Sequence, residues 1–107
     1  MVYVIGFTVF KDKILSGEKF QTIRLVRKRR PPRIGETLRL YWHLRRKDCE
    51  LLKEVVCVYS MIWKWKDMKD NVDLARLDGF EGLEDFRRWF ERYNPTDETK
   101  FMVIRWE

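Results

Sequence analysis

The sequence has few of the residues that build metal sites and disulfide frameworks. Its 107 residues contain two cysteines, Cys49 and Cys57, and one histidine, His43. A tetrahedral zinc site needs four ligands, and these three residues supply too few without help from carboxylates. We therefore expect no metal site and no cofactor. A disulfide is not expected either, because nothing in the sequence indicates secretion.

Long apolar runs are also missing. No segment approaches the roughly 20 apolar residues that a membrane-spanning helix needs, so we expect no membrane partner. The N-terminal segment is too short and too strand-like for a secretory signal peptide, so the expected compartment is the cytoplasm. A chain of this length supports one hydrophobic core but not two, and residues 1–107 are therefore predicted to form a single domain.

Positive charge, in contrast, is in excess. The chain has 23 Lys and Arg against 17 Asp and Glu, which gives a formal net charge of +6. A high charge content with few Asn and Gln also occurs on thermophile surfaces. Clustering indicates more than this, because Arg24, Arg27, Arg33 and the run Lys28–Arg30 lie together with no acid among them. A second cluster, Arg45–Lys47, follows the next expected strand. Two such clusters favour a polyanionic partner, namely RNA or a nucleotide-type ligand.

The hydrophobic pattern predicts a chain dominated by strands. Because helices are few, we expect an α+β fold: a small β-barrel of about five to six strands, with two or three short helices covering its openings. An aromatic stripe at helical spacing near the C-terminus is predicted to be core. The expected strands are Val2–Phe10, Phe20–Val26, Thr37–His43, Leu51–Trp65 and Phe101–Trp106, and the expected helices are Lys11–Ser16, a short one from Asp70 or Asn71 to Leu77, and Glu81–Tyr93.

The segment from Gly17 to Arg24 gathers a lysine, a hydroxyl and an arginine where a helix gives way to a strand. Gly17 suits a helix C-terminus, where a left-handed backbone is needed. The cations beyond it can face a phosphate or a developing oxyanion. The alternative is a solvated lysine and a threonine chosen for strand propensity. Residues three apart in a regular strand point to opposite faces, so Lys19 and Thr22 converge only if the backbone bends where the strand begins.

Several segments resemble the ASCH domain, a domain named for its homology to a human transcription coactivator. The main one is Lys13–Arg24, KILSGEKFQTIR, followed by Ile34–Leu40, IGETLRL. Leu77–Phe80 and the closing Val103–Trp106 look similar too, so that the resemblance covers nearly the whole chain. The resemblance implies a barrel related to the PUA fold. It also implies RNA binding in RNA metabolism or translation-linked processes, which is our leading hypothesis.

The same resemblance implies a hydrolase as an alternative. Some bacterial relatives of similar length are amidohydrolases acting on acetylated cytidine, and others have been assigned ribonuclease activity. Their active lysine and threonine match Lys19 and Thr22, whereas the place of their later glutamate falls near Gly79, with Asp78 and Glu81 as the nearest acids. The expected catalytic residues are thus Lys19, Thr22, Asp78 and Glu81. A protein-interaction adaptor that uses the acidic second half is a third possibility.

If the domain only binds, cations contact phosphates and an exposed aromatic stacks on a base. Burial in the core is the commoner role of a tryptophan. Trp63-Lys64-Trp65-Lys66 is the best exception, because alternation would bring its two tryptophans together. The expected ligand-binding residues are Lys19, Gln21, Thr22, Arg24, Arg27, Lys28, Arg29, Arg30, Trp63 and Trp65.

Overall fold

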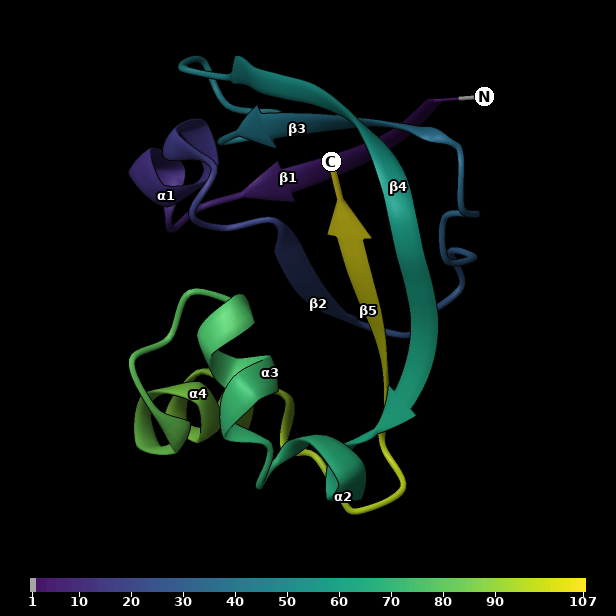
Figure 1. Cartoon of the computed structure of the whole chain (residues 1–107), viewed down its shortest axis with the longest axis vertical. Helices are drawn as coiled ribbons and strands as arrows, with labels where there is room; N and C mark the ends of the chain where they lie inside the picture. The colour runs from purple at the N-terminus through teal and green to yellow at the C-terminus, as the bar shows by residue number, and fades with distance from the viewer. Residues whose placement is uncertain (1) are drawn as a thin grey trace.

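The computed structural model describes residues 2–107, which form a curled five-stranded sheet with the order β1-β3-β4-β5-β2 (Figure 1). The strands are β1 (Val2–Phe7), β2 (Gln21–Leu25), β3 (Thr37–Trp42), β4 (Glu50–Lys64) and β5 (Lys100–Trp106). The helices are α1 (Lys11–Ser16), α2 (Trp65–Met68), α3 (Val72–Leu77), α4 (Leu83–Phe90) and a 3₁₀ turn, Glu91–Tyr93. The predicted α+β class and the barrel-like sheet are confirmed.

The long strand β4 joins the two halves of the sheet. Its first part pairs antiparallel with β3 and its second part pairs antiparallel with β5. β1 lies parallel to β3, and β2 lies antiparallel to β5. The curl of the sheet leaves β1 and β2 as its two edges. They approach closely, since the Arg24 side chain on β2 reaches the Gly6 carbonyl on β1.

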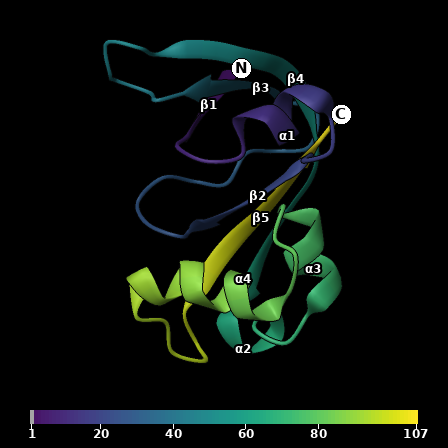
Figure 2. The same ribbon diagram turned by 90° about the vertical axis from the view of Figure 1, so that its left-hand side faces the viewer.

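Strand β5 divides its side chains between two hydrophobic clusters. Met102, Ile104 and Trp106 point into the cluster inside the curl of the sheet. Phe101 and Val103 point the other way, into an aromatic cluster beneath α2, α3 and α4. The alternation predicted for this strand is confirmed. Figure 2 shows these three helices gathered at one end of the molecule, away from α1.

The prediction was wrong for the end of β4. Trp65 was expected to finish the strand, but it begins α2, and no separate helix was expected there. The Trp65 ring stacks on Phe86 at 5.9 Å between centroids and is 8% exposed. Burial of a large aromatic ring outweighs local strand propensity. The next helix, α3, follows the prediction, with Asn71 rather than Asp70 as its cap, since the Asn71 side chain accepts a hydrogen bond from the Leu74 amide.

Within residues 2–107, no helix is both long enough and apolar enough to cross a membrane. The same part of the chain contains no group of three or more His, Cys, Asp or Glu residues placed to hold a metal ion.

Candidate functional site

A partly enclosed cavity, here called the Lys19 cavity, lies where the end of β1, the start of β2 and the helices α3 and α4 meet. Lys19, Thr22, Arg24 and Asp78 all line it. The sequence motif and a residue almost sixty positions later thus share one hollow. Five aromatic side chains and a further arginine also line it: Phe7, Phe10, Phe80, Trp89, Tyr93 and Arg92.

The end of α1 explains how Lys19 and Thr22 come together. Gly17 ends the helix with a left-handed backbone, φ 86°, where a residue with a Cβ is strained. The Lys19 amide then donates to the Lys13 carbonyl at 2.9 Å, which turns the chain back across the helix. Because β2 begins only at Gln21, Lys19 lies outside the strand, and its side chain does not have to point to the face opposite Thr22. The bend that convergence requires is therefore present.

Lys19 and Asp78 form a buried pair, at 2% and 5% exposure. The Lys19 Nζ lies 3.4 Å from the Asp78 Oδ1, donates to the Asp78 backbone carbonyl, and lies over the Phe10 ring. Loss of hydration raises the pKa of the Asp78 carboxyl to about 6, against the attraction of Lys19. Burial also lowers the pKa of Lys19, against the attraction of Asp78. Burial thus favours the neutral form of each group, whereas their mutual attraction favours the charged forms.

Thr22 and Arg24 form the second polar group of the cavity. The Arg24 Nε donates to the Thr22 Oγ1 at 3.0 Å, and its Nη2 donates to the Gly6 carbonyl at 2.7 Å. The guanidinium lies over the Phe7 ring. These contacts fix the arginine beside the threonine. The hydroxyl keeps its own proton for a ligand, because it accepts from Arg24 rather than donating to it.

Comparison with known proteins points to one fold. No protein-family model and no curated protein matches the chain. A solved structure of an ASCH domain from Lactobacillus crispatus JV V101 is similar, with a TM-score of 0.64 over 99% of this chain and 78% of that chain, at 14% sequence identity. The chain has the fold of an ASCH domain. The resemblance carried by the motifs is thereby confirmed at the level of the fold.

In this ASCH fold, Gln21 stands behind the cavity. It is fully buried, donates to the Leu74 carbonyl at 3.1 Å and to the Asp78 Oδ1 at 3.3 Å, and accepts from Arg105. It was predicted to contact a ligand. The structure instead makes it a support that holds the Asp78 carboxylate in place, because its polar atoms are engaged with protein groups.

Other predicted site residues lie outside the cavity. Glu81 is exposed and is not among the lining residues, so Asp78 alone of the two expected acids reaches the cavity. Trp65 is buried in the aromatic core and is not available to stack on a base. Trp63 is half-buried, and its Nε1 donates to the Tyr59 hydroxyl at 3.1 Å.

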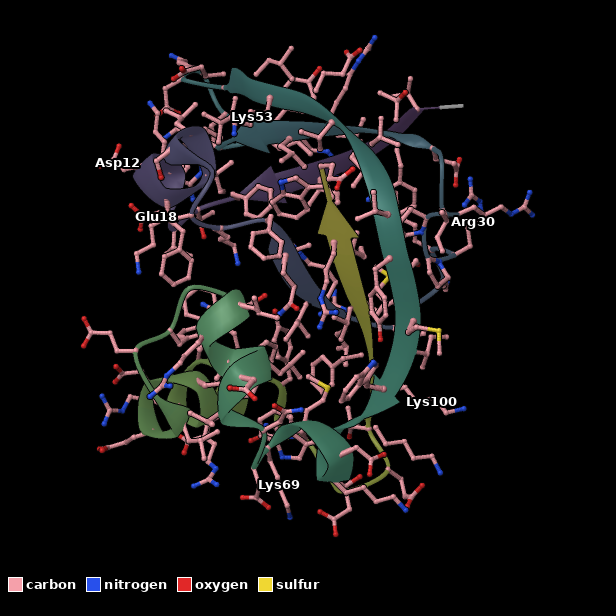
Figure 3. The ribbon with its side chains drawn as sticks, viewed as in Figure 1. Asp12, Glu18, Arg30, Lys53, Lys69 and Lys100 are labelled. Carbon is pink, nitrogen blue, oxygen red and sulfur yellow. The ribbon has the colours of Figure 1, made fainter. Side chains whose placement is uncertain are left out.

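The basic run after β2 is only partly free. All four residues from Arg27 to Arg30 are exposed, but Arg29 lies 3.6 Å from the centre of the Tyr3 ring and Arg30 binds both carboxylate oxygens of Glu36. Figure 3 shows Arg30 reaching outward on the side of the molecule opposite Asp12 and Glu18. The first basic cluster precedes β3 and the second, Arg45–Lys47, follows it. The two clusters therefore lie at opposite ends of that strand and do not form one surface along it.

Several aromatic wall residues were missed by the sequence reasoning. Trp89 and Tyr93 were assigned to the core with the rest of the helical stripe. Phe86 and Phe90 are buried there. Trp89 and Tyr93 also pack against that cluster, but they stay half-exposed and line the cavity as well. The width of the aromatic stripe could have indicated this. A short helix on a small domain buries only one face, so aromatic residues beyond that face are expected to stay partly exposed.

Proposed function

We propose that this protein binds RNA and holds one base in the Lys19 cavity. A single observation carries the proposal: Lys19, Thr22, Arg24 and Asp78 share one cavity with five aromatic rings. The ASCH fold supports the same conclusion, as does the net charge of +6.

The chemistry of the walls suits a base that has left its stack. Proteins recognise unstacked bases by aromatic stacking and by hydrogen bonds to their edges. Trp89 and Tyr93 offer half-exposed rings at the mouth. Deeper in, the carboxylate of Asp78 accepts hydrogen bonds and the hydroxyl of Thr22 donates or accepts. Both kinds of contact are thus available to one flipped or single-stranded base.

Cations lie on two sides of this cavity, on β2 and on the 3₁₀ turn after α4. Arg24 and Arg92 line it, and Arg27 and Lys28 follow on the exposed loop beyond the strand. Arginine and lysine contacts with phosphates give affinity without sequence preference and make binding depend on salt. The phosphates on either side of the held base are therefore expected to run past Arg24 toward the basic loop.

The test is a titration with single-stranded and structured RNA by fluorescence anisotropy at several salt concentrations. We expect binding at low salt that weakens linearly on logarithmic axes as salt rises. Arg24→Gln should weaken binding strongly, whereas Arg39→Gln, an equal loss of charge on an exposed part of β3, should change it little. Absence of binding to both RNAs at low salt would refute the proposal.

Hydrolysis of an acylated cytidine-type nucleoside is the second candidate. The buried pair of Lys19 and Asp78 beside Thr22 favours it, because a lysine with a lowered pKa can act as a base. Thr22, or a water that it positions, would attack the amide carbonyl carbon. The carbon–nitrogen bond would then break, the proton passing to the leaving amine, with Arg24 stabilising the oxyanion. If Thr22 itself attacks, a water then hydrolyses the acyl-threonine ester and restores the hydroxyl, so that by either route the products are a carboxylate and a free amine.

Turnover of N4-acetylcytidine, followed by its absorbance, tests this candidate. Lys19→Ala and Thr22→Ala should both abolish it while circular dichroism shows that the fold is retained. Glu84→Gln, on the exposed side of α4, is the matched control and should retain full turnover. Undiminished activity in the Lys19 and Thr22 variants would exclude this catalytic assignment without affecting the proposal of RNA binding.

A further inference from the structure

The two edge strands of the sheet are joined by side chains rather than by backbone ladders. Within residues 2–107, β1 and β2 share no strand pairing. Arg24 on β2 donates to the Gly6 carbonyl at 2.7 Å, and Arg29, beyond β2, donates to the Val4 carbonyl. Val4 and Gly6 both lie on the open edge of β1. Because guanidinium groups on flexible stems make these bridges, this seam can open without breaking a sheet ladder.

A second cavity, here called the seam cavity, lies behind these arginines. Its floor is formed by side chains of the barrel core, chiefly Ile5, Met102 and Ile104, with Tyr3 beside them. Its volume is about 170 Å³. An apolar cavity of about 150 Å³ in another protein stays dry and binds benzene. The size therefore suits one aromatic ring.

The rim of the seam cavity carries positive charge without a counterion. Arg24, Arg27 and Arg29 line it, and no carboxylate does. In the described part of the chain, none of these three guanidinium groups forms an ion pair with Asp or Glu. A ligand that combines an apolar body with one negative charge complements both the floor and the rim.

The apolar floor of the seam cavity disfavours binding of a nucleobase. A base in this cavity would bury amide and amine groups against Ile5, Met102 and Ile104, which offer no hydrogen-bond partners. Burying an unpaired polar group costs about 1–3 kcal/mol. A hydrocarbon ring has no such cost. An RNA base therefore belongs to the Lys19 cavity, where polar side chains are present, and not here.

We propose that the seam cavity is a second binding site, which takes a small aromatic carboxylate. The ring lies against Ile5, Met102 and Ile104, and the carboxylate is bound by Arg29 and Arg27 at the rim. The Arg29 guanidinium lies 3.6 Å from the centre of the Tyr3 ring and donates to the Val4 carbonyl, so its position at the rim is already fixed before a carboxylate binds. The proposal does not depend on RNA binding or on hydrolysis, because the apolar floor and Arg29 take part in neither; Arg27 is the one residue shared with the phosphate path.

Phenylacetate is the probe, titrated into the full chain and followed by methyl and amide NMR. We expect saturable shifts of the Ile5, Met102 and Ile104 methyl groups, with the Trp89 indole signal unmoved. Arg29→Gln should weaken binding by roughly tenfold or more, the effect of losing a charge-assisted contact. Arg39→Gln removes the same charge from an exposed side chain on β3 that does not line the cavity, and should leave the affinity within about twofold.

A neutral analogue separates charge from shape. Benzyl alcohol has a similar ring without the carboxylate and should bind at least about tenfold more weakly than phenylacetate. The proposal is overturned if the core methyl groups do not shift at millimolar phenylacetate, or if the Trp89 signal moves in their place. It is equally overturned if Arg29→Gln and Arg39→Gln weaken binding alike, or if benzyl alcohol binds as well as phenylacetate.

Discussion

The Lys19 cavity and the seam cavity lie on either side of Arg24, which lines both. They differ in how the charges that line them are balanced. The Lys19 cavity holds a buried cation and a buried anion that neutralise each other. The seam cavity has arginines at its rim and no acid. The first cavity adds a paired lysine and carboxylate and a hydroxyl to its arginines, and so offers directional polar groups. The second retains net charge but offers few directional contacts. The same basic protein thus presents two different kinds of recognition surface.

Breaking the buried pair should have the largest effect. Asp78→Ala leaves the Lys19 ammonium buried without its partner, and uncompensated buried charges cost about 3–5 kcal/mol of the free energy of unfolding. Urea denaturation measures the loss. Replacing both residues, as in Lys19→Met with Asp78→Leu, should recover much of the stability. The exposed pair of Arg39 and Glu54 is the matched comparison, and Glu54→Ala should be nearly neutral.

Removing Arg24 tests the residue that both cavities share. Arg24→Ala deletes the hydrogen bonds to Thr22 and to the Gly6 carbonyl, and we expect the free energy of unfolding to fall by about 2 kcal/mol. Hydrogen exchange should then quicken in β1, which loses one of its two arginine bridges across the seam. Unchanged exchange in β1 would show that the arginine does not hold the seam.

The pH dependence of stability distinguishes the two cavities, because only the Lys19 cavity contains an acid. The folded-state pKa of Asp78, about 6, lies above its ordinary value of 3.8. The folded state therefore binds the proton more tightly than the unfolded state. This stabilising contribution is complete below about pH 4 and is lost as the pH rises through 6, by at most about 1.4 kcal/mol per pH unit.

Urea denaturation of the wild type and of Asp78→Asn between pH 4 and 7 measures this contribution. The stability of the wild type relative to the variant should fall across that range. Parallel pH profiles for the two proteins would place the Asp78 carboxyl in a solvated environment instead.

The smallest effect concerns the turn that directs Lys19 into its cavity. Gly17→Ala places a Cβ on a left-handed residue, and the free energy of unfolding should fall by about 1 kcal/mol, although open space surrounds the site. Gly82→Ala is the matched control, since its backbone is extended and space is also open there. Equal stability losses in a thermal melt would contradict a conformational role for Gly17.

Patterns within single elements gave good predictions. α1 ends before Gly17 as expected, and β5 alternates its side chains between two clusters. The first half of the candidate site was also visible, since Lys19, Thr22 and Arg24 lie within one short segment. The position of Trp65 was not predictable in this way. Its local sequence favours a strand, whereas packing against the rings of Phe86, Phe90 and Phe101 stabilises it at the start of a helix.

The local sequence by itself determined the basic charge, the strand-rich α+β pattern and the helix stop that precedes Lys19, because charge, side-chain periodicity and glycine chemistry act over a few residues. Only the tertiary structure decided that Asp78 and not Glu81 meets Lys19, that Gln21 lies behind the cavity in contact with Asp78, and that Trp89 and Tyr93 face a cavity. Those outcomes depend on how α3 and α4 pack against β2 and β5. Such packing joins residues far apart in the chain, and no local pattern records it.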